Sequence, residues 1–316
     1  MTERATILSL GSIMPSVDTA LDKTFIVWRG LGGVLDEIIN VHAPMIRALV
    51  TRGAMPVDTA LIDRLPCLEL IANFGVGYDS VDVAAAAARG IVVTNTPDVL
   101  NDEMGDFTIG LLLATIRRLP QADRYLRAGQ WAQGAFPLGA SLRGRRIGIA
   151  GMGRIGRVVA HRLSGFDVPV AYYARNRNSD LPYRHYRDLC ALAGDVDILI
   201  VVLPGGAATH HAVDAAVLAA LGRDGVLINV ARGSVVDEVA LIDALSAGRI
   251  LAAGLDVFAA EPLVPATLIG MDNVVLLPHI GTATHHTRGL MGELLLRNVM
   301  SWFEGIGPVT PIAITA

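Results

Sequence analysis

The sequence is poor in cysteine and has no excess of positive charge. Cys67 and Cys190 are the only cysteines in 316 residues and form no CxxC spacing, so neither a zinc site nor a disulfide framework is indicated. We expect two buried thiols in a reducing compartment, the cytoplasm. The 26 basic residues are outnumbered by 30 acidic ones, and the net charge of −4 argues against nucleic acid as a main partner.

The sequence also lacks an apolar run of the roughly 18 residues that a membrane-spanning helix needs, although its mean hydropathy is high, at +0.48. Its first residues include an acidic residue, Glu3, and do not resemble a secretion signal. We therefore expect no membrane partner. With 52% hydrophobic and 18% charged residues over this length, the chain is predicted to fold into about two domains.

Short apolar runs alternate with longer stretches rich in Ala and Leu, a pattern typical of parallel strands joined by crossover helices. In the first third, strands are predicted at 6–10, 24–28, 45–50, 68–73 and 91–94, and helices at 58–64 and 81–89. A long helix is expected over 102–119, with Asn101 as its N-cap and Pro120 as its stop signal.

A second series of strands starts at residue 147. Its strands are predicted at 147–150, 168–174, 198–203, 225–230, 251–257 and 274–277, and its helices at 155–163, 215–220 and 239–247. The fold class is therefore α/β, with two doubly wound parallel-sheet domains.

A glycine-rich motif, Gly151-Met-Gly-Arg-Ile-Gly156, joins the strand at 147–150 to the helix at 155–163. In that context the GxGxxG glycines allow a tight turn, a close approach to a pyrophosphate and packing of the helix on the strand. Backbone N–H groups and the helix dipole would hold the anion. The residues expected to bind a dinucleotide are Gly151, Met152, Gly153, Arg154, Ile155 and Gly156.

An NAD-specific site needs an acidic residue about 20 residues after the fingerprint, to bind the ribose 2′-OH. None occurs here, and the strand at 168–174 is followed by Arg175, Asn176 and Arg177. Cationic side chains with an amide suit a 2′-phosphate, which a carboxylate would repel. NADPH (or NADP+) is therefore predicted over NADH, with a solvated basic turn as the alternative.

Three polar side chains follow predicted strands of the second series, where an α/β sheet gathers its site: Arg232, Glu261 and His279. Arg232 can bind a substrate carboxylate and polarise the adjacent carbonyl. A hydrogen bond between Glu261 and His279 would favour the imidazolium, as a general acid for carbonyl reduction requires. Each residue alone fits a structural role, but together with the fingerprint they indicate hydride chemistry.

The chain resembles the D-2-hydroxyacid dehydrogenase family over essentially its whole length. The motifs that carry the resemblance are Asn73-Phe-Gly-Val-Gly77-Tyr-Asp, Gly151-Met-Gly-Arg-Ile-Gly156, Ile228-Asn-Val-Ala-Arg-Gly-Ser-Val-Val-Asp237-Glu, Gly254-Leu-Asp-Val-Phe and Leu277-Pro-His279-Ile-Gly. Within the family it is most similar to the glyoxylate/hydroxypyruvate reductases and the plant-type hydroxyphenylpyruvate reductases.

The resemblance implies roles for particular residues. Arg232, Glu261 and His279 would be catalytic, and Arg232 and His279 would also bind the substrate. The backbone amides around Val76 and Gly77 would bind the substrate carboxylate. Asp256 would contact the nicotinamide carboxamide, and Ala231 and Gly281 would complete the cofactor contacts.

One pair of residues departs from the family pattern. Relatives usually carry Val-Ala in the interdomain helix, where this chain has Met104-Gly105. A glycine inside a helix costs up to about 1 kcal/mol relative to alanine. Gly105 is therefore expected either to loosen a hinge or to let another element pack closely.

The combined prediction is two Rossmann or flavodoxin-like domains with the active site in the cleft between them. Residues 1–99 and 286–316 would form the substrate-binding domain, and residues 100–285 the NADP-binding Rossmann domain. The expected reaction is the NADPH-dependent reduction of a small 2-oxo acid, glyoxylate or hydroxypyruvate, to a D-2-hydroxy acid, glycolate or D-glycerate. An aryl-pyruvate reductase and a dinucleotide-sensing, corepressor-like protein remain alternatives, and phosphoglycerate dehydrogenase is disfavoured by the basic cofactor loop.

Two further features are interpreted more simply. The histidine pairs 210–211 and 285–286 lack accompanying carboxylates or thiols, and neighbouring residues point in different directions, so no metal is expected. The irregular segment around Trp131 and Phe136, which projects toward a partner subunit in the family, favours a homodimer. A hydrophobic loop contact within the chain is the alternative.

Overall fold

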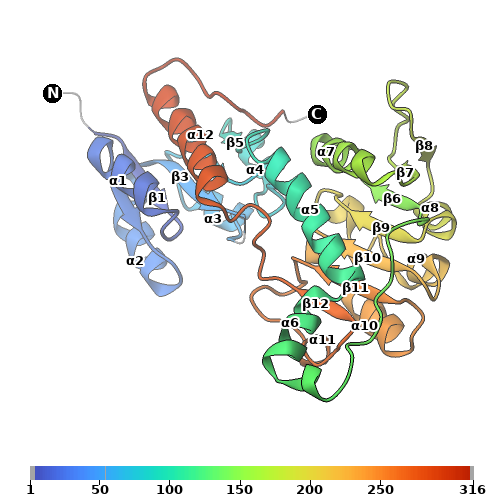
Figure 1. Ribbon diagram of the computed structural model, residues 1–316. Coiled ribbons are helices and arrows are strands. Elements are labelled where there is room, and N and C mark those ends of the chain that lie inside the picture. The colour runs from blue at the N-terminus through green and yellow to red at the C-terminus, as the bar shows by residue number, and fades with distance from the viewer. Residues whose placement is uncertain (1–3, 54, 314–316) are drawn as a thin grey trace. The chain divides into compact units, whose positions relative to one another are not determined.

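The computed structural model describes residues 4–53 and 55–313, and the chain divides into two compact units (Figure 1). The first unit comprises Met1–Leu100 and Ala283–Ala316, and the second comprises Asn101–Thr282. Each unit contains its own parallel sheet, so the predicted α/β class with two parallel-sheet domains is confirmed. The assignment of substrate to the first unit and of nucleotide to the second stays a prediction.

In the described part of the first unit, five parallel strands form a sheet in the order β2-β1-β3-β4-β5. Their bounds are Thr6–Ser9 (β1), Ile26–Arg29 (β2), Ile46–Arg52 (β3), Leu70–Phe74 (β4) and Val92–Thr94 (β5). The helices are Pro15–Thr24 (α1), Gly33–His42 (α2), Thr59–Asp63 (α3), Val83–Ala88 (α4) and His285–Phe303 (α12). All five strands overlap the apolar runs that predict them, and β1, β3, β4 and β5 bury most of their side chains, whereas the edge strand β2 has no buried residue.

In the second unit, seven parallel strands follow the order β12-β11-β10-β9-β6-β7-β8. Their bounds are Ile147–Ala150 (β6), Val170–Tyr173 (β7), Arg184–Tyr186 (β8), Ile198–Val201 (β9), Val226–Asn229 (β10), Ala252–Leu255 (β11) and Val274–Leu276 (β12). The helices are Asn101–Ile116 (α5), Leu119–Arg127 (α6), Arg154–Leu163 (α7), Leu189–Asp195 (α8), Ala215–Leu221 (α9), Glu238–Ser246 (α10) and Ala266–Ile269 (α11).

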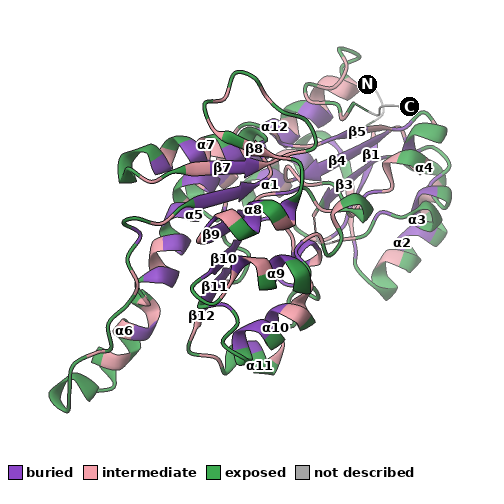
Figure 2. Cartoon of the chain, turned by 90° about the vertical axis from the view of Figure 1, so that its right-hand side faces the viewer, coloured by how far each residue is buried: buried purple, intermediate pink, exposed green. Residues whose placement is uncertain are grey.

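The second sheet is covered on both faces, and its strands are largely buried (Figure 2). Ala253 and Leu255 of β11 belong to a core cluster with apolar residues of α8, α9 and α10. Gly254 between them points the other way, because a Cβ there would lie 2.3 Å from Oγ1 of Thr115 on α5. No helix among residues 4–53 and 55–313 is both long and apolar enough to cross a membrane.

Aspartate side chains start many of these helices. A carboxylate at the N-cap accepts a hydrogen bond from an amide of the first turn, which otherwise has no partner inside the helix. The N-cap residues that do so are Asp58, Asp82, Asp188, Asp214 and Asp237. They fix where the α-helices that follow β3, β4, β8, β9 and β10 begin.

The helix predicted over 102–119 is shorter than expected, and the role predicted for Pro120 is wrong. Helix α5 ends at Ile116, and Pro120 lies in the first turn of α6 instead of stopping α5. Proline has no N–H to donate to the carbonyl four residues earlier, which here is that of Ile116. That carbonyl accepts a hydrogen bond from Ala140 N at 3.2 Å, and Arg118 adopts a left-handed conformation with φ of 55°.

The prediction of two buried cysteines is also wrong. Cys67 is exposed, and Cys190 is only partly buried on α8. Both follow apolar residues in the sequence, but an apolar neighbourhood does not determine which side chain faces the core. Both thiols are free.

Gly105 lets α5 and α7 pack closely, which is the second of its two predicted consequences. A Cβ at position 105 would lie 2.5 Å from Cγ1 of Val158 on α7. The preceding residue, Met104, is buried, and its Sδ lies 2.7 Å from the position that a Cβ of Gly281 would take. In place of the Val-Ala of the family pattern, the larger Met104 fills space next to Gly281, and the smaller Gly105 leaves space for Val158.

Gly105→Ala is expected to destabilise the second unit by about 1–3 kcal/mol, because the new methyl group overlaps Val158 and outweighs the better helix propensity of alanine. Urea unfolding measures this free energy. Gly110→Ala in the same helix is the matched control, since a Cβ there meets nothing within 4 Å. It should stabilise by up to about 1 kcal/mol. A similar gain for both variants would contradict the packing argument.

Candidate active site

Strands β10, β11 and β12 are neighbours in the second sheet, and a polar residue of the predicted site follows each of them. Arg232 lies three residues past β10, Glu261 lies in the loop after β11, and His279 lies three residues past β12. Because parallel strands end at one edge of their sheet, the three loops meet there. The structure thus brings together the three residues that the sequence singles out as catalytic.

A buried amide holds Arg232 in place. Asn229, at the end of β10 and 1% exposed, donates from Nδ2 to the Arg232 carbonyl at 3.0 Å and accepts at Oδ1 from Ala231 N at 3.1 Å. The next residue must be glycine, because a Cβ on Gly233 would lie 1.9 Å from the carbonyl carbon of Phe258. This close approach brings the backbone next to Arg232 against the loop that carries Glu261.

Glu261 and His279 form a hydrogen-bonded pair. Nδ1 of His279 lies 2.7 Å from Oε2 of Glu261, and Oε1 of Glu261 accepts from Phe258 N at 3.0 Å. An ionised carboxylate only accepts hydrogen bonds, so Nδ1 carries a proton and Nε2 is left for a ligand. Burial acts to raise the pKa of Glu261, but the hydrogen bonds from His279 and Phe258 and the charges of His279 and Arg232 outweigh it and lower that pKa.

Asp256, immediately after β11, fixes the loop of His279. Its carboxylate is 1% exposed and accepts from Ile280 N at 2.8 Å and from Gly281 N at 2.9 Å. Burial raises the pKa of Asp256, and these two amides partly offset the effect. His279 adopts a left-handed conformation, φ 54°, that few non-glycine residues take. The predicted contact of Asp256 and Gly281 with a nicotinamide stays a prediction.

The nucleotide fingerprint has the geometry that a pyrophosphate needs. Gly151 has φ of 106°, and a Cβ on Gly156 would lie 2.1 Å from the Gly151 carbonyl oxygen, so both positions require glycine. Gly153 is the N-cap of α7, and a Cβ there would meet nothing within 4 Å. Open space therefore lies in front of a helix N-terminus, which favours an anion. The residues present fit a dinucleotide phosphate group.

The basic turn after β7 fits a 2′-phosphate. Arg175, Asn176 and Arg177 are exposed, and no hydrogen bond or ion pair joins their side chains to any residue that the structure describes. The turn itself is ordered by Tyr172, whose hydroxyl accepts from Asn178 N at 3.0 Å. Two guanidinium groups without carboxylate partners leave their donors available to an anionic ligand.

Val76 and Gly77 lie in the first unit, in the loop after β4. The carbonyls of Gly75 and Gly77 accept from Nδ2 of Asn73 at 3.2 and 2.9 Å, and the Val76 carbonyl accepts from Nδ2 of Asn95 at 2.9 Å. Among the described residues, nothing accepts from the Val76 or Gly77 amide. The loop thus presents two amides suited to a carboxylate.

Sequence reasoning missed the asparagines that hold these loops. Asn229 is the last residue of β10 and Asn73 the last but one of β4, and each braces the loop that follows its strand. The signal was present, since both are uncharged polar residues at the end of an apolar run and directly precede a proposed binding loop. A buried amide needs hydrogen-bond partners, and the adjacent loop supplies them.

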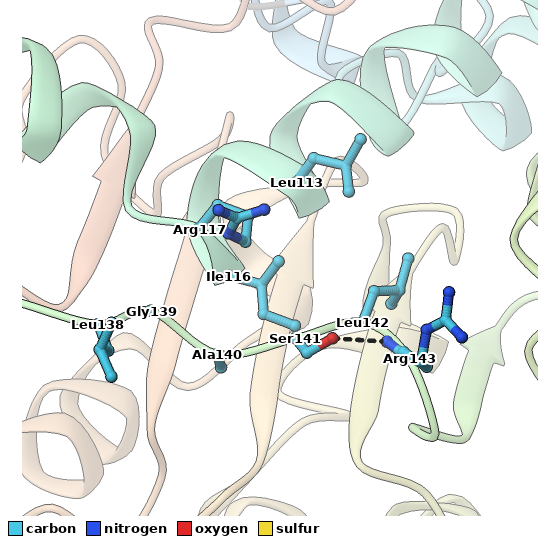
Figure 3. A pocket seen from close by; sticks show the side chains of 9 residues that line it. All are labelled: Leu113, Ile116, Arg117, Leu138, Gly139, Ala140, Ser141, Leu142 and Arg143. Atoms are coloured by element: carbon cyan, nitrogen blue, oxygen red, sulfur yellow. Dashed lines mark hydrogen bonds between the residues drawn. The ribbon is translucent and has the colours of Figure 1, made fainter.

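A cavity of about 400 Å³ lies elsewhere, along α5 (Figure 3). Leu113 and Ile116 line it from α5, Arg117 lines it from the turn that follows, and residues 138–143 line it from an extended segment further along the chain. None of the predicted catalytic or cofactor-binding residues lines it. Its shape therefore does not bear on the site at the sheet edge.

A GxGxxG turn and a histidine–carboxylate pair with an arginine, all on one parallel sheet, define a nicotinamide-dependent dehydrogenase. Residues 109–281 match the model of the D-isomer specific 2-hydroxyacid dehydrogenase, NAD binding domain. The chain therefore belongs to the D-isomer specific 2-hydroxyacid dehydrogenase family, as its motifs indicated.

Known proteins are similar over almost the whole chain. Glyoxylate/hydroxypyruvate reductase A of Arabidopsis thaliana is 45% identical, covering 87% of this chain and 88% of its own. Hydroxyphenylpyruvate reductase of Plectranthus scutellarioides is 43% identical, covering 94% and 95%. The crystal structure of an NADPH-dependent glyoxylate/hydroxypyruvate reductase from Sinorhizobium meliloti, in complex with NADP and malonate, superposes with a TM-score of 0.92 at 46% identity and covers 98% and 97%.

Glu261→Gln is expected to lower the free energy of unfolding at about pH 7. The pKa of Glu261 is lowered in the folded protein, so its ionised form stabilises the fold above the ordinary value of 4.5. That contribution disappears as the pH falls through the lowered folded pKa. Urea unfolding at several pH values between about 7 and 3 should show the difference from the unmodified protein shrinking. Asp243→Asn, an exposed change on α10, is the control, and a pH-independent difference for E261Q would contradict the pairing.

Proposed function

We propose that this protein reduces small 2-oxo acids, glyoxylate and hydroxypyruvate, to the corresponding D-2-hydroxy acids with NADPH. The observation that carries the proposal is the 2.7 Å contact between His279 Nδ1 and Glu261 Oε2. These residues follow strands of the same sheet as β6, the strand that precedes the nucleotide fingerprint. The named activities of the Arabidopsis and Sinorhizobium relatives support the choice of substrates.

The proposed mechanism uses three side chains of the second unit. Arg232 holds the substrate carboxylate and polarises the neighbouring carbonyl. Bound NADPH would supply the hydride to the carbonyl carbon. His279 donates a proton from Nε2 to the carbonyl oxygen, and Glu261 stabilises the protonated imidazole through Nδ1. The amides of Val76 and Gly77, in the first unit, are proposed as a further anchor of the carboxylate.

Reduction of aryl pyruvates is the second candidate. It is supported by the 43% identity to the hydroxyphenylpyruvate reductase of Plectranthus, which is nearly as high as that to the Arabidopsis reductase. The two candidates share the catalytic residues and differ only in the size of the group next to the carbonyl. A substrate panel separates them.

His279→Ala is expected to lower kcat by about a hundredfold or more, because the general acid is lost, and to leave NADPH affinity nearly unchanged. The measurement follows the absorbance of NADPH with glyoxylate, hydroxypyruvate and phenylpyruvate, and a fluorescence titration gives the cofactor affinity. His161→Ala, an exposed change on α7, is the control. Full turnover by H279A would refute the general-acid assignment, and no turnover of any 2-oxo acid by the unmodified protein would refute the function.

We further propose that Arg175 and Arg177 select NADPH over NADH. The double change Arg175→Ala and Arg177→Ala is expected to raise KM for NADPH by about tenfold or more and to leave KM for NADH within about twofold, since only NADPH carries the 2′-phosphate. The control is Arg223→Ala with Arg249→Ala, which removes the same charge from two other exposed positions. An unchanged preference would contradict the assignment of this turn.

The proposal includes a homodimer. Trp131, in the short helical turn Gln130–Ala132 after α6, is 68% exposed, and Leu138, which lines the cavity of Figure 3, is 98% exposed. Phe136, in contrast, packs edge-on against Tyr125 with ring centres 5.3 Å apart, as a contact within the chain. Large exposed apolar side chains on one segment favour an interface between subunits. Sedimentation analysis reports the oligomeric state.

The cytoplasm is proposed as the compartment. Both cysteines are free, which suits a reducing environment. Fractionation of cells that produce the protein tests this location.

A further inference from the structure

Two arginines meet at the carboxyl end of the first sheet. Arg52 is the last residue of β3 and the register partner of Phe74, the last residue of β4. Arg288 lies in the first turn of α12, and its guanidinium carbon is 5.5 Å from the centre of the Phe74 ring. The pKa of Arg288 is lowered by its burial and then by the charge of Arg52. The two positive charges therefore share the surroundings of one aromatic ring.

Among the residues that the structure describes, no carboxylate pairs with either arginine. Within residues 4–53 and 55–313, neither guanidinium forms an ion pair or a hydrogen bond. Arg47, at the other end of β3, shows the contrast: it also lies over an aromatic ring, that of Phe303 at 5.1 Å, but Glu69 holds it through bonds of 2.7 and 3.0 Å. A partly buried charge without a partner is unfavourable, and an anionic ligand relieves that cost.

The pair lies next to the loop proposed to hold the substrate carboxylate. Phe74 is followed by Gly75, Val76 and Gly77, and two residues of chain span at most about 7 Å. Both features belong to the first unit, so their proximity follows from one sheet. An anion at the arginines and a carboxylate at the Val76 and Gly77 amides are therefore within reach of one small molecule.

We propose that Arg52 and Arg288 form a second anion subsite, which binds a carboxylate or phosphate at the far end of a 2-oxo acid. The inference rests on the proposed function and deepens it, because it names 2-oxo acids with a second negative group as the favoured substrate class. The planar guanidinium group suits either anion, since it donates two parallel hydrogen bonds to carboxylate or phosphate oxygens.

Two matched substrate pairs test the subsite. Oxaloacetate and 2-oxobutanoate differ by a carboxylate in place of a methyl group, and 3-phosphohydroxypyruvate and hydroxypyruvate differ by a phosphate. For each pair, the ratio of kcat/KM for the charged over the uncharged acid is measured with NADPH. The unmodified protein should favour at least one charged acid by about tenfold or more, and Arg52→Gln should reduce that ratio to near one.

Two other variants serve as controls. Arg47→Gln removes the same charge from the opposite end of β3 and should leave both ratios unchanged. Arg288→Lys keeps the charge and an aliphatic stem but loses the planar guanidinium group, so it should reduce the ratio while the protein still folds. Thermal unfolding of each variant separates loss of fold from loss of recognition.

Each outcome has one interpretation. A ratio that falls only for the carboxylate pair assigns a dicarboxylate, and one that falls only for the phosphate pair assigns a phosphorylated acid. If neither ratio changes in R52Q, or R47Q changes them equally, the subsite is refuted. If no 2-oxo acid is turned over, the proposed function fails, and calorimetric binding of D-malate against D-2-hydroxybutanoate to the unmodified protein and R52Q still tests the subsite.

Discussion

The buried carboxylate of Asp256 is the constraint on which the catalytic loop depends. Its two oxygens accept the amides of Ile280 and Gly281, and its own carbonyl accepts from His279 N at 2.9 Å. A buried carboxylate without hydrogen-bond donors is costly. The loop therefore has to keep the conformation in which its amides donate to Asp256. That conformation includes a left-handed His279, which is tolerated only where neighbouring contacts determine the backbone. The position of the imidazole next to Glu261 follows from it.

Neutral amides perform the same task at two other strand ends. Asn229, the last residue of β10, binds the backbone of Ala231 and Arg232, and Asn73, the last but one of β4, binds the carbonyls of Gly75 and Gly77. An amide carries both donors and an acceptor, so it satisfies a loop without adding a charge beside the substrate anion. In the loop of His279, where the backbone amides of Ile280 and Gly281 both need an acceptor, the bracing group is instead the carboxylate of Asp256. The loops proposed to bind the substrate carboxylate are thus braced by neutral asparagines, and the loop that carries the proton-donating histidine is braced by an aspartate.

Much of the fold could be predicted because parallel strands buried on both faces appear as apolar runs. The exception, β8, consists of Arg184, His185 and Tyr186 and has no such run. Pro120 was misread because a proline is equally suited to end one helix and to begin the next. The catalytic candidates were found as titratable residues in the loops that follow apolar strands. Asn73 and Asn229 were missed because an uncharged residue at a strand end does not stand out from a strand, and its role depends on the loop that folds back over it.

The arginines at the ends of the strands differ in whether a carboxylate pairs with them. Arg47 and Arg184 stand at the amino ends of β3 and β8, and both pair with carboxylates. Arg29, the last residue of the edge strand β2, pairs with Asp22. Arg52 ends β3 and Arg175 follows β7, and neither has an ion-pair partner among the described residues. Ligands of α/β sheets bind outside the carboxyl ends of the strands. Arg52 and Arg175, which have no carboxylate partner among the described residues and lie at this edge of the first and the second sheet, are therefore placed for an anion that arrives with the ligand.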